Sequence, residues 1–237
     1  MKLKVDVKKI LDILSSGMFI SKSSPLVHSL PIVFTKDAVL VQSHYKVRIA
    51  SVLKVKKDYF VEYEAKEERV GIPEELYKKL SSWGFTGEIK LSLEGDTITV
   101  DGTARHDSLA GDIVSDKPFP LAFKESEIGD IPEKIEKIES YFMAEAKDLL
   151  LPKASEYVFE FKDQKLTGRI GGFTQEMPVE GKGKDITIKV PAEFYNVILS
   201  NLSGKVVVIL HELMMVFKQS GQFEKTFVLA TKKKKND

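Results

Sequence analysis

The sequence predicts an α+β fold that is dominated by β-strands and built as two similar domains. At least thirteen short segments carry β-branched and aromatic residues, many alternating with polar ones, as is typical of strands. Four other segments have the spacing of short amphipathic helices. The length of 237 residues suits two medium domains, because single hydrophobic cores usually stop growing above about 200 residues. The strand segments are 2–6, 31–35, 38–43, 46–55, 59–65, 88–95, 96–102, 157–163, 165–172, 186–190, 205–212, 213–219 and 226–230.

The composition excludes several classes of protein. Hydrophobic residues at 43% and charged residues at 30% provide enough material for packed cores, which excludes wholesale disorder. The absence of cysteine excludes disulfides and thiolate metal sites, and it fits a reducing intracellular compartment. No segment approaches the roughly 20 apolar residues that a bilayer span requires. Charges also interrupt the N-terminal segment, so neither a membrane protein nor a secreted one is expected.

The first two helices have clear start signals. After Asp6, which is a suitable N-cap, residues 7–16 place Val7, Ile10, Leu11 and Leu14 on one face. The segment 72–84 has Pro73 at the helix start, acidic residues in the first turn and Gly84 at its end. Each is expected to pack one apolar face on a sheet.

The other two helices are expected in the second half of the chain. One is expected at 146–155, with Pro152 as a kink or an early stop. The other, at 191–204, opens with Pro191 and closes near Gly204. A competing interpretation makes 131–150 a single long helix with an isoleucine-rich face.

An internal repeat supports two copies of one unit. One two-residue deletion aligns the segments around the second and fourth helices, and their opening Pro-x-Glu-x-Tyr pattern does not follow from composition alone. The alternative is that strand-rich segments align by composition. The repeat predicts a first domain at 1–110, a linker at 111–138, a second domain at 139–231 and a basic tail at 232–237. The paired positions are Pro73, Glu75, Tyr77, Leu80, Gly87 and Leu93 with Pro191, Glu193, Tyr195, Ile198, Gly204 and Leu210.

No motif indicates catalysis, a metal or a cofactor. The four histidines, at 28, 44, 106 and 211, lack the spacing of metal ligands. The sequence contains no nucleophile elbow, no P-loop and no GxGxxG. The carboxylate pairs fall in a turn and at a helix start, where solvation or the helix dipole explains them. We therefore expect a protein that is not an enzyme.

Lysines recur on the expected helices. The net charge of +1 excludes a globally basic nucleic-acid binder, so any contact with DNA requires lysines gathered on one face. If the helices share one face, their exposed sides form such a basic surface; the simpler interpretation is ordinary solvated helix surface. The lysines in question are Lys8, Lys9, Lys78, Lys79, Lys147 and Lys153.

The order and spacing of these elements resemble the DNA sliding clamps of the proliferating cell nuclear antigen type. VKKILDIL resembles the first clamp helix with its paired lysines, and VGIPEELYKKL the second. SEYVFEFKDQKLTGRIGGF resembles the start of the second clamp domain, and FEKTFVLATK the closing strand and tail. The resemblance implies two β-rich clamp domains, each with two short helices on one face of the sheets. It also implies that three subunits close into a ring with helices inside.

The resemblance implies three sets of site residues. The six lysines would face double-stranded DNA in the channel. Subunits would pair edge strands near 104–114 and 171–180, which include Leu109 and Met177. Where the family commonly has a proline, this chain has Thr231, and its linker is longer and more acidic. The pocket for DNA polymerase and other clamp-binding proteins would comprise His44, Val47, Phe119, Leu121, Val228, Leu229 and Ala230.

The sequence therefore favours a sliding clamp that acts as a processivity factor, without cofactors and without a membrane role. Such a ring, a homotrimer or heterotrimer opened by a clamp loader, holds DNA by enclosure, so its phosphate contacts can stay weak. The alternative is a two-domain β-rich interaction module with no DNA role. In that case the repeat reflects duplication alone, and the lysines are solvated surface.

Overall fold

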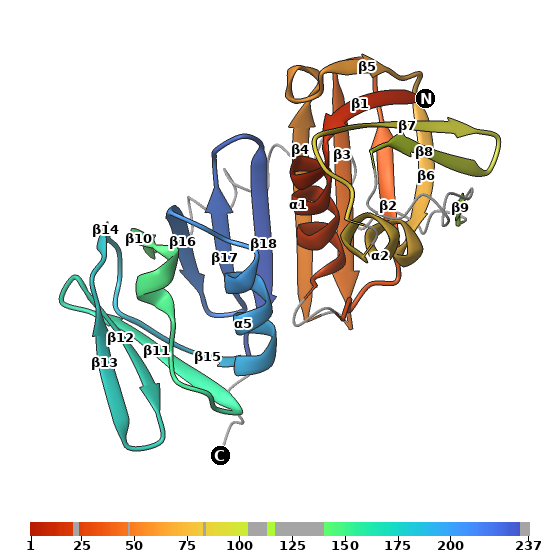
Figure 1. Ribbon diagram of the computed structural model, residues 1–237. Helices are drawn as coiled ribbons and strands as arrows, with labels where there is room; N and C mark the ends of the chain where they lie inside the picture. The colour runs from red at the N-terminus through yellow and green to blue at the C-terminus, as the bar shows by residue number, and fades with distance from the viewer. Residues whose placement is uncertain (21–23, 47, 83, 104–112, 117–139, 233–237) are drawn as a thin grey trace. The chain divides into compact units, whose positions relative to one another are not determined.

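The computed structural model describes residues 1–20, 24–46, 48–82, 84–103, 113–116 and 140–232 (Figure 1). The chain divides into two compact units, each built from several stretches. Unit 1 contains Met1–Ser43, Ser51–Ala122 and Gly221–Glu224. Unit 2 contains His44–Ala50, Phe123–Ser220 and Lys225–Asp237. The domain boundaries expected near 110 and 138 lie outside the described residues.

Unit 1 contains two sheets and two α-helices. One sheet has the strand order β5-β1-β7-β8-β9, and the other has the order β4-β3-β2-β6. The helices are α1 (Val7–Met18) and α2 (Glu74–Ser82), and a 3₁₀ turn, η1, covers Lys57–Tyr59. The strands are β1 (Lys2–Asp6), β2 (Ser29–Phe34), β3 (Ala38–Tyr45), β4 (Ile49–Lys56), β5 (Glu62–Glu64), β6 (Glu68–Pro73), β7 (Glu88–Glu94), β8 (Thr97–Gly102) and β9 (Ile113–Val114).

Unit 2 repeats this plan. Its sheets have the orders β14-β10-β16-β17-β18 and β13-β12-β11-β15, so each strand label is nine higher than that of its counterpart in unit 1. The helix α5 (Ala192–Ser200) follows β15 as α2 follows β6, and the 3₁₀ turn η3 (Ala146–Leu149) follows β10 as α1 follows β1. The strands are β10 (Ser140–Glu145), β11 (Glu156–Lys162), β12 (Lys165–Ile170), β13 (Phe173–Met177), β14 (Glu180–Lys182), β15 (Ile186–Pro191), β16 (Lys205–His211), β17 (Met214–Gln219) and β18 (Glu224–Ala230).

The duplicated β-rich architecture confirms the predicted fold class. Equivalent backbone bonds fix the helices to the sheets in both units. The first residue of α2, Glu74, donates its N–H to the carbonyl of His28, which precedes β2. The first residue of α5, Ala192, donates its N–H to the carbonyl of Ser155, which precedes β11. The predicted repeat is therefore a repeat of structure.

Helix α1 forms as its sequence predicts. The Asp6 carboxylate accepts a hydrogen bond from the Lys8 backbone N–H at 2.8 Å, which satisfies one of the free donors of the first turn. The helix ends at Phe19, which has a left-handed backbone and donates to the Ser15 carbonyl. The residues that α1 buries include Val7, Ile10, Ile13, Leu14 and Met18, and these pack in the core of unit 1.

The expected third helix is wrong in length and type. Only Ala146–Leu149 is helical, as a single 3₁₀ turn, and Leu150 already has an extended backbone. Pro152 disfavours helical geometry in the residue before it, which stops the helix early. Two buried tyrosines fix the resulting loop, because the Tyr195 hydroxyl donates to the Leu149 carbonyl at 2.7 Å and the Tyr157 hydroxyl to the Pro152 carbonyl at 3.0 Å.

The competing interpretation of 131–150 as one long helix is also wrong over its described part. Residues Ser140–Glu145 form β10, which pairs with β14 on one side and β16 on the other. Their burial alternates strictly, with Phe142 fully buried and Tyr141 and Met143 exposed. This period of two is that of a strand. Within the part of the chain that is described, no helix is long and apolar enough to cross a membrane.

Candidate nucleic-acid interface

Helices α1 and α2 pack side by side in unit 1 and bring four of the six lysines onto one pair of helices (Figure 1). Lys8 is exposed, and no described residue bonds its ammonium group. Lys9 is half-buried because its side chain folds onto Tyr59. Its Nζ donates to the Tyr59 carbonyl at 3.2 Å and lies 4.5 Å from the centre of the Tyr59 ring. Lys8 is therefore the α1 lysine that is available to a ligand.

Lys78 and Lys79 lie in the second half of α2. Lys79 is half-buried, whereas Lys78 is exposed and forms an ion pair with Glu74, four residues earlier, at 2.5 Å. The other oxygen of the Glu74 carboxylate is 2.9 Å from Nδ1 of His28. Hydrogen bonds from Lys78 and His28 hold the pKa of Glu74 below its ordinary value. The carboxylate therefore stays ionised and partly neutralises Lys78.

In unit 2 the candidate lysines lie outside the α-helix. Lys147 is exposed in η3, and Lys153 is exposed in the loop that follows. Helix α5 is mostly buried, and its exposed residues are Glu193 and Ser200. Helix α5 itself contains no lysine, so the candidate lysines of unit 2 are those of the turn and the loop.

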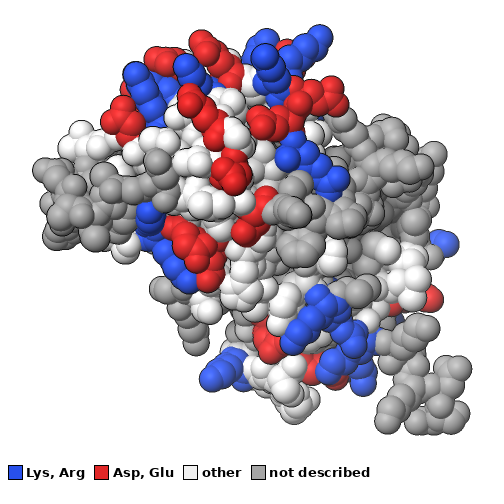
Figure 2. Space-filling view, turned by 90° about the vertical axis from the view of Figure 1, so that its right-hand side faces the viewer, with Lys and Arg blue, Asp and Glu red and all other residues white. Residues whose placement is uncertain are grey.

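Acidic residues accompany the lysines. Asp12 on α1 and Asp148 in η3 add to Glu74, Glu75 and Glu193 on the other helices. On the face drawn in Figure 2, which is seen at 90° to the view of Figure 1, blue and red side chains are likewise mixed without a large patch of one sign. Phosphate contacts through the surfaces of these helices and of η3 therefore depend on individual lysines rather than on a strong positive field.

The expected partner pocket is described in part, because Val47, Phe119 and Leu121 lie outside the described residues. His44 is exposed near the end of β3. Along β18, Val228 is half-buried and packs on a small apolar cluster around Ile209 and Val216. Leu229 points to the opposite face of the strand and is fully buried in unit 2. Its side chain is thus part of the core and is not available to a partner.

Thr231 closes the end of β18 with two hydrogen bonds. Its backbone N–H donates to the Leu213 carbonyl at 3.0 Å, and its hydroxyl donates to the Glu212 carbonyl at 2.5 Å. The preceding residue, Ala230, is half-buried and donates its N–H to the carbonyl of Arg48 at 2.7 Å. Proline at position 231 could form neither bond, because it has no backbone N–H and no hydroxyl. Thr231 therefore fixes the end of β18 through contacts that a proline would not make.

The expected subunit contact has one described member. Leu109 lies outside the described residues, and Met177, at the end of β13, is buried with 2% of its surface exposed. Met177 faces Gly168 on β12, against which Leu151 also packs. The exposed apolar residue of the same edge strand is Phe173, at 49%. Any partner of β13 therefore meets Phe173 rather than Met177.

The described residues contain no cluster of three or more histidine, aspartate or glutamate side chains that could hold a metal ion. The two buried side-chain atoms that lack a hydrogen-bond partner in the described chain are the hydroxyls of Ser29 and Tyr59. They do not form a catalytic arrangement with a neighbouring base.

Comparison with known proteins identifies the fold. No protein-family model matches the sequence, and no curated protein matches it. Among solved structures, PCNA of A. fulgidus bound to the C-terminal region of FEN-1 has a TM-score of 0.76 at 12% identity, over 99% of both chains. PCNA of Thermococcus kodakaraensis has a TM-score of 0.76 at 12% identity, over 98% of this chain and 99% of the other.

A two-protein complex gives the same result. The PCNA2–PCNA3 complex of Sulfolobus tokodaii matches with a TM-score of 0.69 at 16% identity, over 98% of this chain and 99% of the other. The chain therefore has the PCNA-like sliding-clamp fold over almost its whole length. The resemblance inferred from the sequence is correct at the level of fold.

Proposed function

We propose that this chain is a subunit of a sliding clamp that encircles duplex DNA without sequence specificity and acts inside the cell as a processivity factor. The observation that carries the proposal is the duplicated strand order of the two units, together with the match to PCNA structures over 98–99% of this chain. A clamp acts by enclosure and needs no catalytic group of its own. Its partners are DNA polymerase, other replication proteins and a clamp loader.

The DNA contact in this proposal is weak and distributed. Lys8, Lys78, Lys147 and Lys153 are the candidates with exposed side chains, while Lys9 and Lys79 are half-buried and play a smaller part. Neighbouring acids offset these charges, so the contacts neutralise few phosphates. Enclosure makes strong contacts unnecessary, and the salt dependence of binding is correspondingly shallow.

We propose that partners bind the face of β18 that carries Val228 and Ala230. Val228 and Ala230 are both half-buried, and His44 is exposed in the same unit. A short peptide with apolar anchors fits such a surface, since a few buried anchors supply most of the binding energy. The A. fulgidus PCNA structure contains the C-terminal region of FEN-1, which supports a peptide as the kind of ligand. Val47, Phe119 and Leu121 complete the proposed pocket.

Two measurements test this proposal. Size-exclusion chromatography with light scattering should give about three times the mass of the 26.7 kDa chain, alone or mixed with related subunits. The purified ring, loaded on nicked circular DNA, should remain bound, and it should slide off after the circle is cut once. A monomer at every concentration, or equal release from circular and linear DNA, would favour an interaction module without a DNA role.

A further inference from the structure

Three side chains at the start of α2 are joined through one carboxylate. Nδ1 of His28 lies 2.9 Å from one oxygen of Glu74, and Nζ of Lys78 lies 2.5 Å from the other. The Glu74 side chain is largely buried at 18% exposed, whereas those of His28 and Lys78 are 73% and 55% exposed. The exposed nitrogens of His28 and Lys78 thus each contact one oxygen of the Glu74 carboxylate.

The backbone holds the donors in place before any ligand arrives. The Glu74 N–H donates to the His28 carbonyl at 2.8 Å, and the adjacent residues Ser29 and Pro73 are opposite each other in the β2–β6 ladder. The helix then places Lys78 one turn beyond Glu74, on the same face. His28 is therefore attached to the helix start at two points, through its carbonyl and through its ring.

A phosphodiester presents two unesterified oxygens to a donor pair much as a carboxylate does. We propose that His28 and Lys78 form a phosphate-binding pair for the DNA backbone, and that Glu74 is an internal competitor which occupies the pair when DNA is absent. This inference rests on the proposed clamp function. It adds His28, which is not among the DNA-binding residues expected from the sequence, as a DNA contact, and it assigns Glu74 the opposite effect on affinity.

The competition has a physical consequence for a ring that must move. A phosphate can engage the pair only after Lys78 leaves Glu74, so each contact carries the cost of breaking an existing ion pair. That cost is small, because the Lys78 side chain is 55% exposed and water screens the pair. It shortens the life of each contact, and phosphates can exchange quickly as the duplex passes.

The simpler role for the same carboxylate is stabilisation of α2. An acid in the first turn complements the helix dipole, and a Glu-to-Lys pair four residues apart strengthens the helix. That role alone predicts that Glu74→Gln lowers the melting temperature and leaves DNA affinity equal to that of any variant with the same charge change. Glu75 provides the matched control, since it is the next residue, is exposed, and has no bonded partner in the described chain.

The experiment measures fluorescence anisotropy of a labelled random-sequence duplex over a range of salt concentrations. Glu74→Gln should bind the duplex about two- to five-fold more tightly than Glu75→Gln at low salt, which is the range expected for release of one exposed ion pair. His28→Gln should weaken binding more in the Glu74→Gln background than in the native chain, since the competitor is then gone. Lys78→Gln should likewise weaken binding more in the Glu74→Gln background than in the native chain.

The outcomes separate this inference from the proposed function. Equal affinities of Glu74→Gln and Glu75→Gln, alongside salt-dependent duplex binding by the native chain, would overturn the competitor and leave the clamp standing. The same holds if His28→Gln has no effect in the Glu74→Gln background. Absence of duplex binding by every variant, Glu74→Gln included, would overturn the phosphate-binding pair, and retention of the loaded ring on circular DNA would then test the clamp by itself. Melting temperatures of all variants show whether lost binding reflects lost folding.

Discussion

Gly87 and Gly204 occupy equivalent positions in the two units and make the same hydrogen bond. Gly87 has a φ of 71°, and its carbonyl accepts from the N–H of Val7 at 2.9 Å. Gly204 has a φ of 65°, and its carbonyl accepts from the N–H of Ala146 at 2.8 Å. In each unit the donor follows the first strand, and the acceptor precedes the strand that pairs with it.

These two glycines should be sensitive to alanine. A side chain in the left-handed region costs about 1–2 kcal/mol, and no atom lies within 4 Å of a Cβ at either position, so the cost is purely that of the backbone. Gly87→Ala and Gly204→Ala should each lower the free energy of unfolding by about 1 kcal/mol in denaturant titrations. Gly172→Ala, in open space and without a positive φ, should change little. Equal values for all three would contradict this account.

A buried lysine is expected to stabilise the C-terminal end of α5. Lys225 is only 8% exposed, and its Nζ donates to the Asn201 carbonyl at 3.2 Å. The last turn of α5 has no basic residue, so Lys225 from β18 supplies the charge that the helix dipole favours. Lys225→Met should lower the free energy of unfolding by about 1–3 kcal/mol, since a buried acceptor loses a charged donor. The exposed Lys205→Met is the matched control, and an equal loss there would refute the assignment.

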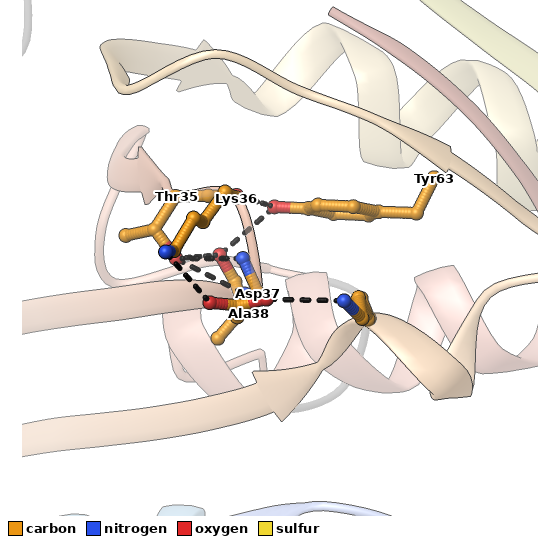
Figure 3. Close-up of polar contacts among 6 residues, drawn as sticks. Thr35, Lys36, Asp37, Ala38 and Tyr63 are labelled. Carbon is orange, nitrogen blue, oxygen red and sulfur yellow. Dashed lines mark hydrogen bonds and ion pairs between the residues drawn. The ribbon is translucent and has the colours of Figure 1, made fainter.

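Tyr63 should make stability fall at high pH. Its hydroxyl lies 2.6 Å from the Thr35 carbonyl and 2.9 Å from the Ala38 carbonyl, and so supports the β2–β3 turn that the Asp37–Lys57 ion pair also holds (Figure 3). Burial raises the pKa of Tyr63 from 10.0 to about 12. The neutral hydroxyl is favoured in the folded state, so its contribution is complete below pH 10 and is lost as the pH rises to about 12.

The size of this loss is about 1 kcal/mol, after the pKa shift is discounted for the partial exposure of the ring. Denaturant titrations between pH 9 and pH 12 measure it. Tyr63→Phe should be less stable at neutral pH and should show a shallower decline above pH 10. The exposed Tyr141→Phe serves as control. A decline of unchanged slope in Tyr63→Phe would assign the pH dependence to other groups, such as Tyr59, whose pKa burial also raises.

Much of the fold could be predicted because local signals and tertiary packing agree. Helix α1 has its N-cap at Asp6 and its apolar face as predicted, and all thirteen predicted segments overlap strands. Prediction failed where packing overrides local propensity. Leucines and Ala146 favour a helix at 146–155, but Pro152 and the buried tyrosine hydroxyls hold a 3₁₀ turn and a loop. The thirteen segments leave out β6, β9, β10, β13 and β14; the segment of β6 (Glu68–Pro73), for example, lacks a clear alternation.

The candidate site could be predicted only as residue types along the chain. Periodicity gave the faces of α1 and α2 but not the partners of their lysines, so the engagement of Lys9 by Tyr59 was invisible. The burial of Leu229 follows from the alternation of β18, a signal that was available. The burial of Met177, in contrast, depends on its pairing with Leu166 across the β12–β13 ladder. The contact between His28 and Glu74 joins residues 46 positions apart, which no local pattern reveals.

Reversal of the exposed lysines tests the DNA contact directly. Lys8→Glu, Lys78→Glu and Lys147→Glu together should weaken duplex binding equally across sequences and flatten its salt dependence, because fewer counterions are released. Folding should survive, since all three side chains are exposed. The control is the triple reversal of Lys36, Lys90 and Lys162, which are exposed lysines of strands and turns. If both triple variants lost the same affinity, overall charge rather than these positions would explain the binding.

The edge strand β13 allows assembly to be separated from folding. Phe173 is 49% exposed, whereas Met177, four residues later on the same strand, is 2% exposed. Phe173→Glu should therefore yield monomers by light scattering that remain folded, because the substitution charges only an exposed edge. Met177→Glu buries an unpaired carboxylate and should unfold unit 2 or lower the melting temperature strongly.

The exposed Thr174→Glu, next to Phe173 on the strand, shows whether any added charge on this edge suffices to prevent assembly. A Phe173→Glu chain that still assembled fully, with Met177→Glu unfolded as expected, would place the subunit contact away from β13. A Met177→Glu chain that folded normally and became monomeric would show instead that Met177 turns outward in solution. The pair thus distinguishes an interface residue from a core residue on one strand.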